Sequence, residues 1–172
     1  MLYADSKNYL LSKLTAAGLK SKPYTTQKSF ARSQESHIGA VLFESENILR
    51  NGSKTFYKDQ EGAQKKRRRL FDRDLSFTVI IGDYTDDAVE EIFERFLESL
   101  DIGIYVDGNF VPIEPGSAEW VDTDDSILKA KVAVQIQITF KGGVYRDTGF
   151  AKVSELDIQS VDRTSGKEPT DG

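Results

Sequence analysis

Residues 64–81, the stretch that decides the fold, read QKKRRRLFDRDLSFTVII. In its second half apolar and other side chains alternate, so Leu75, Phe77, Val79 and Ile81 would share one face of a strand. Its first half, Lys65–Arg69, holds five consecutive cations and is too charged to be buried. The pattern predicts one long strand or hairpin arm that leaves the core at its basic end.

An amphipathic helix is predicted directly after this strand, over residues 85–100. Thr85 is a suitable N-cap, and Asp86 and Asp87 stand in the first turn, where the helix dipole favours acidic side chains. The apolar face comprises Ala88, Val89, Ile92, Phe93, Phe96, Leu97 and Leu100. The opposite face carries Glu90, Glu91, Glu94 and Glu98. We expect this helix to lie on a sheet with its acidic side turned outward.

A second long strand is predicted over residues 127–140, ILKAKVAVQIQITF. One face would be apolar from Ala130 to Phe140. The other face would carry Lys129, Lys131, Ala133, Gln135, Gln137 and Thr139. Amides and lysine stems suit a wet or intermolecular surface. Gly142-Gly143 is interpreted as the next turn.

The N-terminal region is predicted to contain one helix and two short strands. The helix would run from Asp5 to Ala17, with Asp5 or Ser6 as its cap and Gly18 at its end. Residues 20–34 are interpreted as a loop or weak hairpin. Strands are expected over 37–43 and 54–58, on either side of an Asn51-Gly52 turn.

Between the second helix and the last strand, the sequence predicts a hairpin with Asp107-Gly108-Asn109 at its turn. Pro112 and Pro115 favour an edge strand or loop there, because proline cannot donate to a sheet ladder. Trp120 and Val121 are interpreted as the start of another short strand, and residues 122–126 as an acidic turn.

The order of these elements predicts an α+β domain, a mostly antiparallel sheet packed with two amphipathic helices. We place this domain at residues 1–145. Residues 146–172 are interpreted as a C-terminal extension whose end is disordered or becomes ordered on assembly.

Charge is distributed unevenly along the 172 residues. The net charge is −5, but residues 1–82 hold 15 Lys and Arg against 8 Asp and Glu, whereas residues 83–128 hold 1 against 14. Residues 129–172 are nearly balanced, at 7 against 6. Such a chain has surfaces that complement other copies of itself or a polyanion.

Composition and motifs argue against catalysis, and we expect no enzyme, cofactor or metal site. The chain has no cysteine and one histidine, His37, and it lacks phosphate-binding glycine motifs. Residues 122–125 resemble a calcium loop but lack its glycine and terminal glutamate. No apolar run has the length of a membrane span, and the N-terminus lacks the apolar block of a signal peptide, so no membrane partner is expected.

Three interpretations of the basic run Lys65–Arg69 stay open. It is a contact with an acidic protein surface, a phosphate-binding segment for nucleic acid, or a charged edge that blocks sheet aggregation. A basic run alone does not distinguish them.

The order of elements over roughly residues 1–145 resembles the tail terminator, or tail completion, proteins of long-tailed bacteriophages and phage-tail-like particles. The resemblance lies in the N-terminal helix, the strand ending in SFTVIIGD, the capped acidic helix, and the strand ILKAKVAVQIQITF. The Lys65–Arg69 segment and the chain after Arg146 depart from the family layout.

The resemblance implies a structural virion protein of the tail, assembled in the host cytoplasm, that uses no cofactor. It would form a homo-oligomeric ring, a hexamer, on the tail tube protein, end tube elongation at the head-proximal end, and offer a joining surface to the head–tail connector or collar, and to a sheath. DNA would only pass through the ring lumen. The alternatives are another head–tail adaptor or completion protein, or a nucleic-acid-binding protein that uses residues 65–69.

A ring needs contacts between unlike patches, so we take charged and polar side chains as candidate contacts. They are Lys65, Lys66, Arg67, Arg68, Arg69, Glu90, Glu91, Glu94, Glu98, Lys129, Lys131, Gln135 and Gln137.

Overall fold

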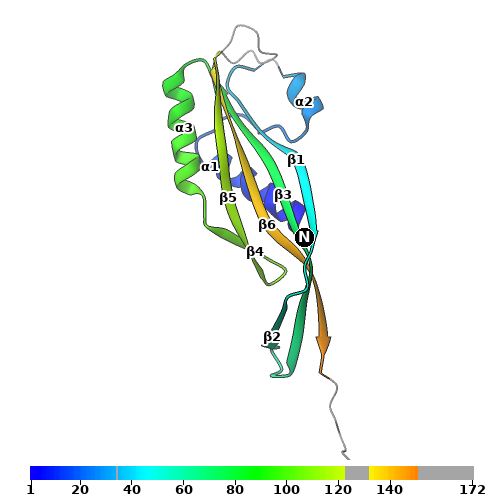
Figure 1. The fold of residues 1–172 in the computed structure, drawn as a ribbon. Helices are drawn as coiled ribbons and strands as arrows, with labels where there is room; N and C mark the ends of the chain where they lie inside the picture. The colour runs from blue at the N-terminus through cyan, green and yellow to red at the C-terminus, as the bar shows by residue number, and fades with distance from the viewer. Residues whose placement is uncertain (34, 123–131, 151–172) are drawn as a thin grey trace, which may run out of the picture.

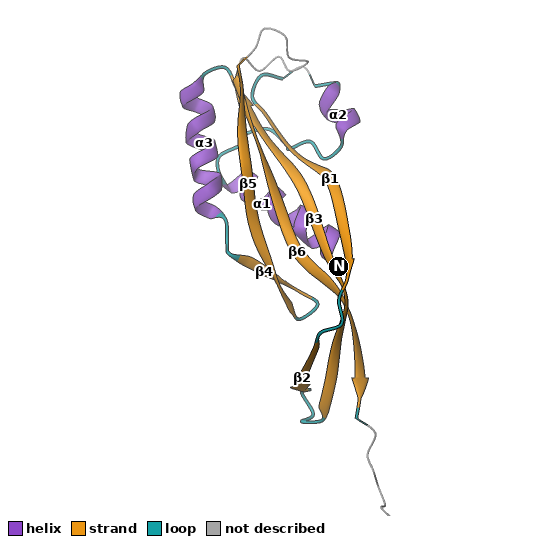
Figure 2. Ribbon diagram, in the orientation of Figure 1, coloured by secondary structure: helices purple, strands orange, loops and turns teal. Residues whose placement is uncertain are grey.

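The computed structural model describes residues 1–33, 35–122 and 132–150. They form a mixed α+β fold built on a six-stranded, antiparallel sheet (Figures 1 and 2). The strand order is β1-β3-β6-β5-β4, and β2 also pairs with β3. The strands are β1 (Ile38–Arg50), β2 (Lys54–Lys58), β3 (Gln64–Asp83), β4 (Gly103–Val106), β5 (Asn109–Asp122) and β6 (Val132–Gly149). The predicted fold class is confirmed.

β3 and β6 form the long central pair of the sheet. Their register runs from Asp83 opposite Val132 to Lys65 opposite Gly149. β1 accompanies β3 only as far as the pair Arg50–Phe71, and β2 takes its place beyond that point. The basic end of β3 therefore extends beyond β1, β4 and β5 together with β2 and the end of β6, and it leaves the core as the sequence predicts (Figure 1).

Helices α1 (Leu2–Ala16) and α3 (Asp86–Ser99) cover one face of the sheet. The core between them includes Leu10, Phe77, Phe96 and Phe140, all fully buried. The short helix α2 (Gln27–Ala31) packs from the opposite face, where Phe30 meets Ala40, Leu42 and Ile80. The alternation along β3 thus directs Leu75, Phe77, Val79 and Ile81 toward α1 and α3, as predicted.

Helix α3 confirms the sequence pattern. The hydroxyl of Thr85 accepts a hydrogen bond from the backbone N–H of Ala88 at 3.3 Å, which caps the helix. Val89, Ile92 and Phe96 are buried. Leu97 is an exception to the predicted apolar face, because 37% of it is exposed.

The N-terminal region differs from the prediction in two places. α1 begins at Leu2 with Met1 as its cap residue and no capping side chain, so neither Asp5 nor Ser6 caps it. Instead Asp5 accepts a hydrogen bond from the N-terminal amine at 2.7 Å, and Ser6 is buried. Residues 27–31, expected in a loop or hairpin, form α2, which Thr26 caps. Gly18 does follow α1 with the left-handed φ of +106°.

β5 is a 14-residue strand, so the expected separate strand at Trp120 is wrong. Two features let it hold prolines. Pairing with β6 starts at Ile113, just after Pro112. The backbone N–H of Ile113 donates to the carbonyl of Ile102, on the β4 side of the strand. Because every second residue of a strand points its nitrogen to the same side, the nitrogen of Pro115 also faces the β4 side, at a position beyond the end of β4 where no strand needs its N–H. A bulge follows between Pro115 and Ala118.

Gly142-Gly143 does not form a turn, and β6 continues through both residues to Gly149. Neither glycine has a positive φ. A Cβ at Gly142 would lie 2.4 Å from Leu2 Cδ2, and one at Gly143 would lie 2.8 Å from Arg69 Nε. These glycines allow α1 and the Arg69 side chain to approach the strand. The acidic turn expected at residues 122–126 and the strand start at 127–131 lie outside the described residues, except that Asp122 ends β5.

Candidate interaction surfaces

The basic end of the sheet forms a projecting arm, which we define as residues 51–70 and 145–150. It contains the β2–β3 hairpin and the last part of β6, and it extends away from the helices (Figures 1 and 2). Eight cationic and three acidic side chains give it a net charge of +5. None of the buried hydrophobic residues of the two core clusters comes from the arm.

The strand register divides the basic run Lys65–Arg69 between the two faces of the arm. Residues opposite one another share a face, and successive residues alternate. Lys65, Arg67 and Arg69 therefore share one face with Tyr57, Tyr145 and Asp147. We call this the paired face. Lys66 and Arg68 lie on the other, which we call the open face. It also carries Lys54, Phe56, Lys58, Arg146 and Thr148.

Arg67 organises the paired face. Its Nε and Nη2 donate to the two carboxylate oxygens of Asp147, both at 2.8 Å, and its Nη1 donates to Asn109 Oδ1 at 2.9 Å. The guanidinium also lies 5.0 Å from the ring centroid of Tyr57, whose hydroxyl donates to Asp147. The bidentate hydrogen bond raises the pKa of Arg67 and lowers that of Asp147. These bonds join the arm to the turn between β4 and β5.

The other two cations of the paired face also have acidic partners. Lys65 Nζ lies 3.6 Å from Asp59, and Arg69 Nε lies 2.7 Å from Asp72. Arg69 also donates from Nη2 to the carbonyl of Gly142 at 2.6 Å. All three odd-numbered members of the predicted contact run thus serve the arm's own structure.

The open face has a different character. Within the described residues, none of Lys54, Lys58, Lys66, Arg68 and Arg146 forms an ion pair. Phe56 is 63% exposed and stacks on Phe150, which is 50% exposed, with ring centroids 5.7 Å apart. The open face thus combines five cations with an exposed aromatic pair.

The exposed side of α3 is the second charged surface. The helix carries six carboxylates and one arginine, a net charge of −5. Glu91 pairs with Arg95 one turn further on. The predicted contact residues Glu90, Glu94 and Glu98 are all exposed, and in the part of the chain that the structure describes they have no cationic partner.

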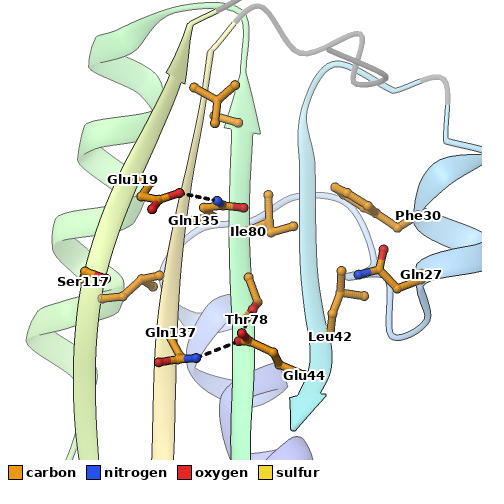
Figure 3. Close-up of a pocket in the computed structure, with 13 residues that line it drawn as sticks. Gln27, Phe30, Leu42, Glu44, Thr78, Ile80, Ser117, Glu119, Gln135 and Gln137 are labelled. Atoms are coloured by element: carbon orange, nitrogen blue, oxygen red, sulfur yellow. Dashed lines mark hydrogen bonds between the residues drawn. The ribbon is translucent and has the colours of Figure 1, made fainter.

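The polar side of β6 lies in an open groove between β5 and α2 (Figure 3). The amide of Gln135 donates to Glu119 and that of Gln137 donates to Glu44, each at 2.9 Å, and Thr78 donates to Glu44 at 2.8 Å. Both glutamines are half-buried. The groove therefore combines the hydrogen-bonded side chains of these residues with apolar ones such as Phe30, Leu42 and Ile80. Lys129 and Lys131, predicted for the same face, lie outside the described residues.

His37 forms a structural link. The backbone N–H of Lys20 donates to its Nε2 at 2.9 Å, so Nε2 accepts. The Nδ1–H then donates to Asp83 at 2.7 Å. His37, directly before β1, is thus bonded through Nε2 to the segment after α1 and through Nδ1 to the end of β3.

Neither a metal site nor a membrane span emerges from the described residues. They hold no group of three or more acidic or histidine side chains that could bind a metal ion, and no helix among them is long and apolar enough to cross a bilayer. No protein-family model matches the chain, and no curated protein matches it.

The sequence predicts which charged residues lie at the two candidate surfaces, but it does not predict which of them form ion pairs. Asp147, Tyr57, Tyr145 and Asn109 were missed as partners of Arg67. The signal for Asp147 was the alternation after Gly143, where VYRDTG continues the strand with period two.

Proposed function

We propose that this chain is a ring-forming structural protein that caps the head-proximal end of a phage or phage-like tail tube. The observation that carries the proposal is the separation of opposite charges onto distant elements, with +5 on the arm and −5 on α3. The order of elements along the chain is the second support, since it resembles that of tail terminators.

Unlike patches on one chain favour heterologous contacts, in which one surface meets a different surface on the next copy. Such contacts close into a ring when the rotation between neighbours divides a full turn. The ring, a hexamer in this proposal, would sit on the tail tube protein, end elongation, and present its other side to a connector, collar or sheath. DNA would pass through its lumen, and no cofactor is involved.

The test is mass measurement in solution followed by negative-stain imaging. We expect a sixfold ring, and we expect purified tail tube protein to stop polymerising when the ring is added. A chain that stays monomeric over the accessible concentration range, or that leaves tube length unchanged, would contradict the proposal. In assembled particles, a ring at the head-proximal end supports the terminator, whereas a ring at the other end identifies a different adaptor.

A nucleic-acid-binding role is the second candidate, because the open face joins an exposed aromatic pair to cations that form no ion pair in the described part of the chain. Phosphates bind such cations, and bases stack on such rings. A gel shift at physiological salt tests it. Affinity that falls steeply with added salt would favour this candidate, and no shift at low salt would exclude it.

A further inference from the structure

The two faces of the arm differ in how many of their cations form ion pairs within the described chain. On the paired face each cation has a carboxylate within 3.6 Å, so its charge is compensated inside the chain. On the open face the positions of β2, β3 and β6 that face outward carry five cations and no acidic residue. The uncompensated positive charge of the arm is therefore concentrated on one face.

The open-face cations form a regular array. Lys54, Arg68 and Arg146 lie side by side across three strands, and Lys66 lies two residues along β3 from Arg68. Two residues of an antiparallel strand span about 6.8 Å. Phe56 lies opposite Lys66 and stacks on Phe150, which adds an apolar contact surface to the array.

Helix α3 carries a matching array of opposite charge. Asp86, Glu90, Glu94 and Glu98 follow one another at intervals of four residues and are all exposed. Four residues of an α-helix rise about 6 Å and advance about 40° around its axis, so these carboxylates form a slanted row that rises about 18 Å along the helix. Leu97, 37% exposed, lies next to Glu98 and offers an apolar contact near the end of this row.

The two arrays lie apart in one molecule. α3 packs against α1 and the upper part of the sheet, whereas the arm projects beyond the β4–β5 hairpin (Figure 1). No ion pair joins the arm to α3 within the described residues. Any pairing of the two arrays must therefore occur between molecules.

We infer that the open face of the arm docks on the acidic side of α3 of a second copy of this chain. The match in sign and net charge favours this partner, and the exposed Phe56–Phe150 pair suits a protein surface with apolar contacts of its own. The inference rests on the proposed ring, whose subunit contact it identifies. Nucleic acid at the same face is an outcome that the experiment distinguishes.

The experiment compares self-association by sedimentation velocity at low salt for the full chain and its charge variants. Lys66→Glu with Arg68→Glu removes two open-face cations. The matched control, Lys22→Glu with Lys28→Glu, makes the same change in net charge on exposed residues outside the arm. We expect the first variant to associate roughly 10- to 100-fold more weakly, because two attractions become repulsions, and the control to associate like wild type.

A charge swap separates a direct contact from a general loss of arm structure. Glu90→Lys with Glu94→Lys should weaken association on its own. Combining these two changes with Lys66→Glu and Arg68→Glu in one chain should restore it, since every contact then carries exchanged charges. Circular dichroism confirms that each variant is folded.

Each outcome has a definite meaning. Association restored by the swap supports the inference whether or not the assemblies are rings that cap tubes. Rings that persist in the Lys66→Glu, Arg68→Glu variant overturn the inference and leave the proposed function standing. A wild-type chain that does not self-associate, but shifts nucleic acid through Lys66 and Arg68, overturns it in favour of phosphate binding.

Discussion

At the scale of single residues, the arm depends on Arg67. This side chain is 25% exposed, bridges β6 through Asp147, and reaches the β4–β5 turn through Asn109. Its neighbour Arg68 is exposed and has no ion pair among the described residues. Adjacent arginines in the sequence therefore differ in their surroundings: Arg67 holds the arm together, and Arg68 is exposed on the open face.

Arg67→Ala should lower the free energy of unfolding by about 1 kcal/mol, the discounted value of a partly exposed bidentate ion pair. The carboxyl of Asp147 has a lowered pKa because Arg67 donates to it. The Arg67–Asp147 pair therefore contributes fully to the free energy of unfolding above pH 3.8, the ordinary pKa of Asp, and this contribution is lost as the pH falls through the lowered pKa of Asp147. Chemical denaturation of wild type and variant over this range measures the difference.

Arg68→Ala is the control for this prediction, because it removes the same type of side chain from the open face. We expect it to change stability by less than about 0.5 kcal/mol. Equal losses from the two substitutions would show that the assignment of faces is wrong.

Tyr9 offers a second residue-scale prediction. Burial, with the hydrogen bond to the Asp101 carboxylate and the charge of that carboxylate, raises the pKa of its phenol to about 12, although the hydrogen bond from the backbone N–H of Asp101 opposes the shift. Because the folded state favours the neutral phenol, the stabilisation is complete below the ordinary value of 10.0 and is lost as the pH rises toward 12. The difference in tyrosinate absorbance between wild type and Tyr9→Phe gives this titration directly. A midpoint near the ordinary tyrosine value in the native protein would contradict the prediction.

At the scale of elements, the alternation of apolar residues and the capping residues predict the strands and helices correctly where no close packing with another element alters the local structure. β2 has the predicted bounds, β3 extends two residues beyond Ile81, and Thr85 caps α3 as expected. The predicted turn at Gly142-Gly143 is wrong because glycine is favoured both in turns and where another element packs closely on a strand. A sequence shows the glycine, and it does not show Leu2 above it.

Gly142→Ala tests that explanation. The new methyl group would lie 2.4 Å from Leu2 Cδ2 and 3.1 Å from the carbonyl oxygen of Arg73, so the buried Leu2 side chain must move out of its place and the contact with the Arg73 backbone is tight. We expect a loss of about 1–3 kcal/mol in the free energy of unfolding. Gly149→Ala is the control on the same strand, since nothing lies within 4 Å of its Cβ position. Similar stability for both variants would contradict the packing role of Gly142.

For the basic run of the arm, the alternation of side chains predicts which residues share a face, but it does not predict which face is neutralised by acidic partners. The distribution of charge along the chain identifies Lys65–Arg69 and the glutamates of α3, but it does not divide the basic run between two faces. The two-residue period of β3 already separates Lys66 and Arg68 from the odd-numbered cations. Which of these two faces is neutralised depends on Asp147, about 80 residues away, and only the β3–β6 register brings it there.

At the scale of the whole molecule, the arm and the other described residues, which we call the body, have separate sources of stability. The body holds both hydrophobic clusters, whereas the arm is held by strand pairing and the contacts of Arg67. An arm that contributes little to the core fits a role in contacts between molecules, because its sequence is then free to serve a partner.

Shortening the arm separates these two roles. Replacing residues 54–68 by Asn-Gly makes Ser53 and Arg69 the ends of a tight hairpin, and keeps the hydrogen bond from the N–H of Arg69 to the carbonyl of Ser53 as the bond that closes its turn. We expect the variant to unfold cooperatively, with a free energy of unfolding within about 2 kcal/mol of wild type, because no cluster residue is removed. We also expect it to lose salt-sensitive self-association in sedimentation velocity. A variant that fails to fold would show that the arm is part of the body, and one that still associates would place the subunit contact elsewhere.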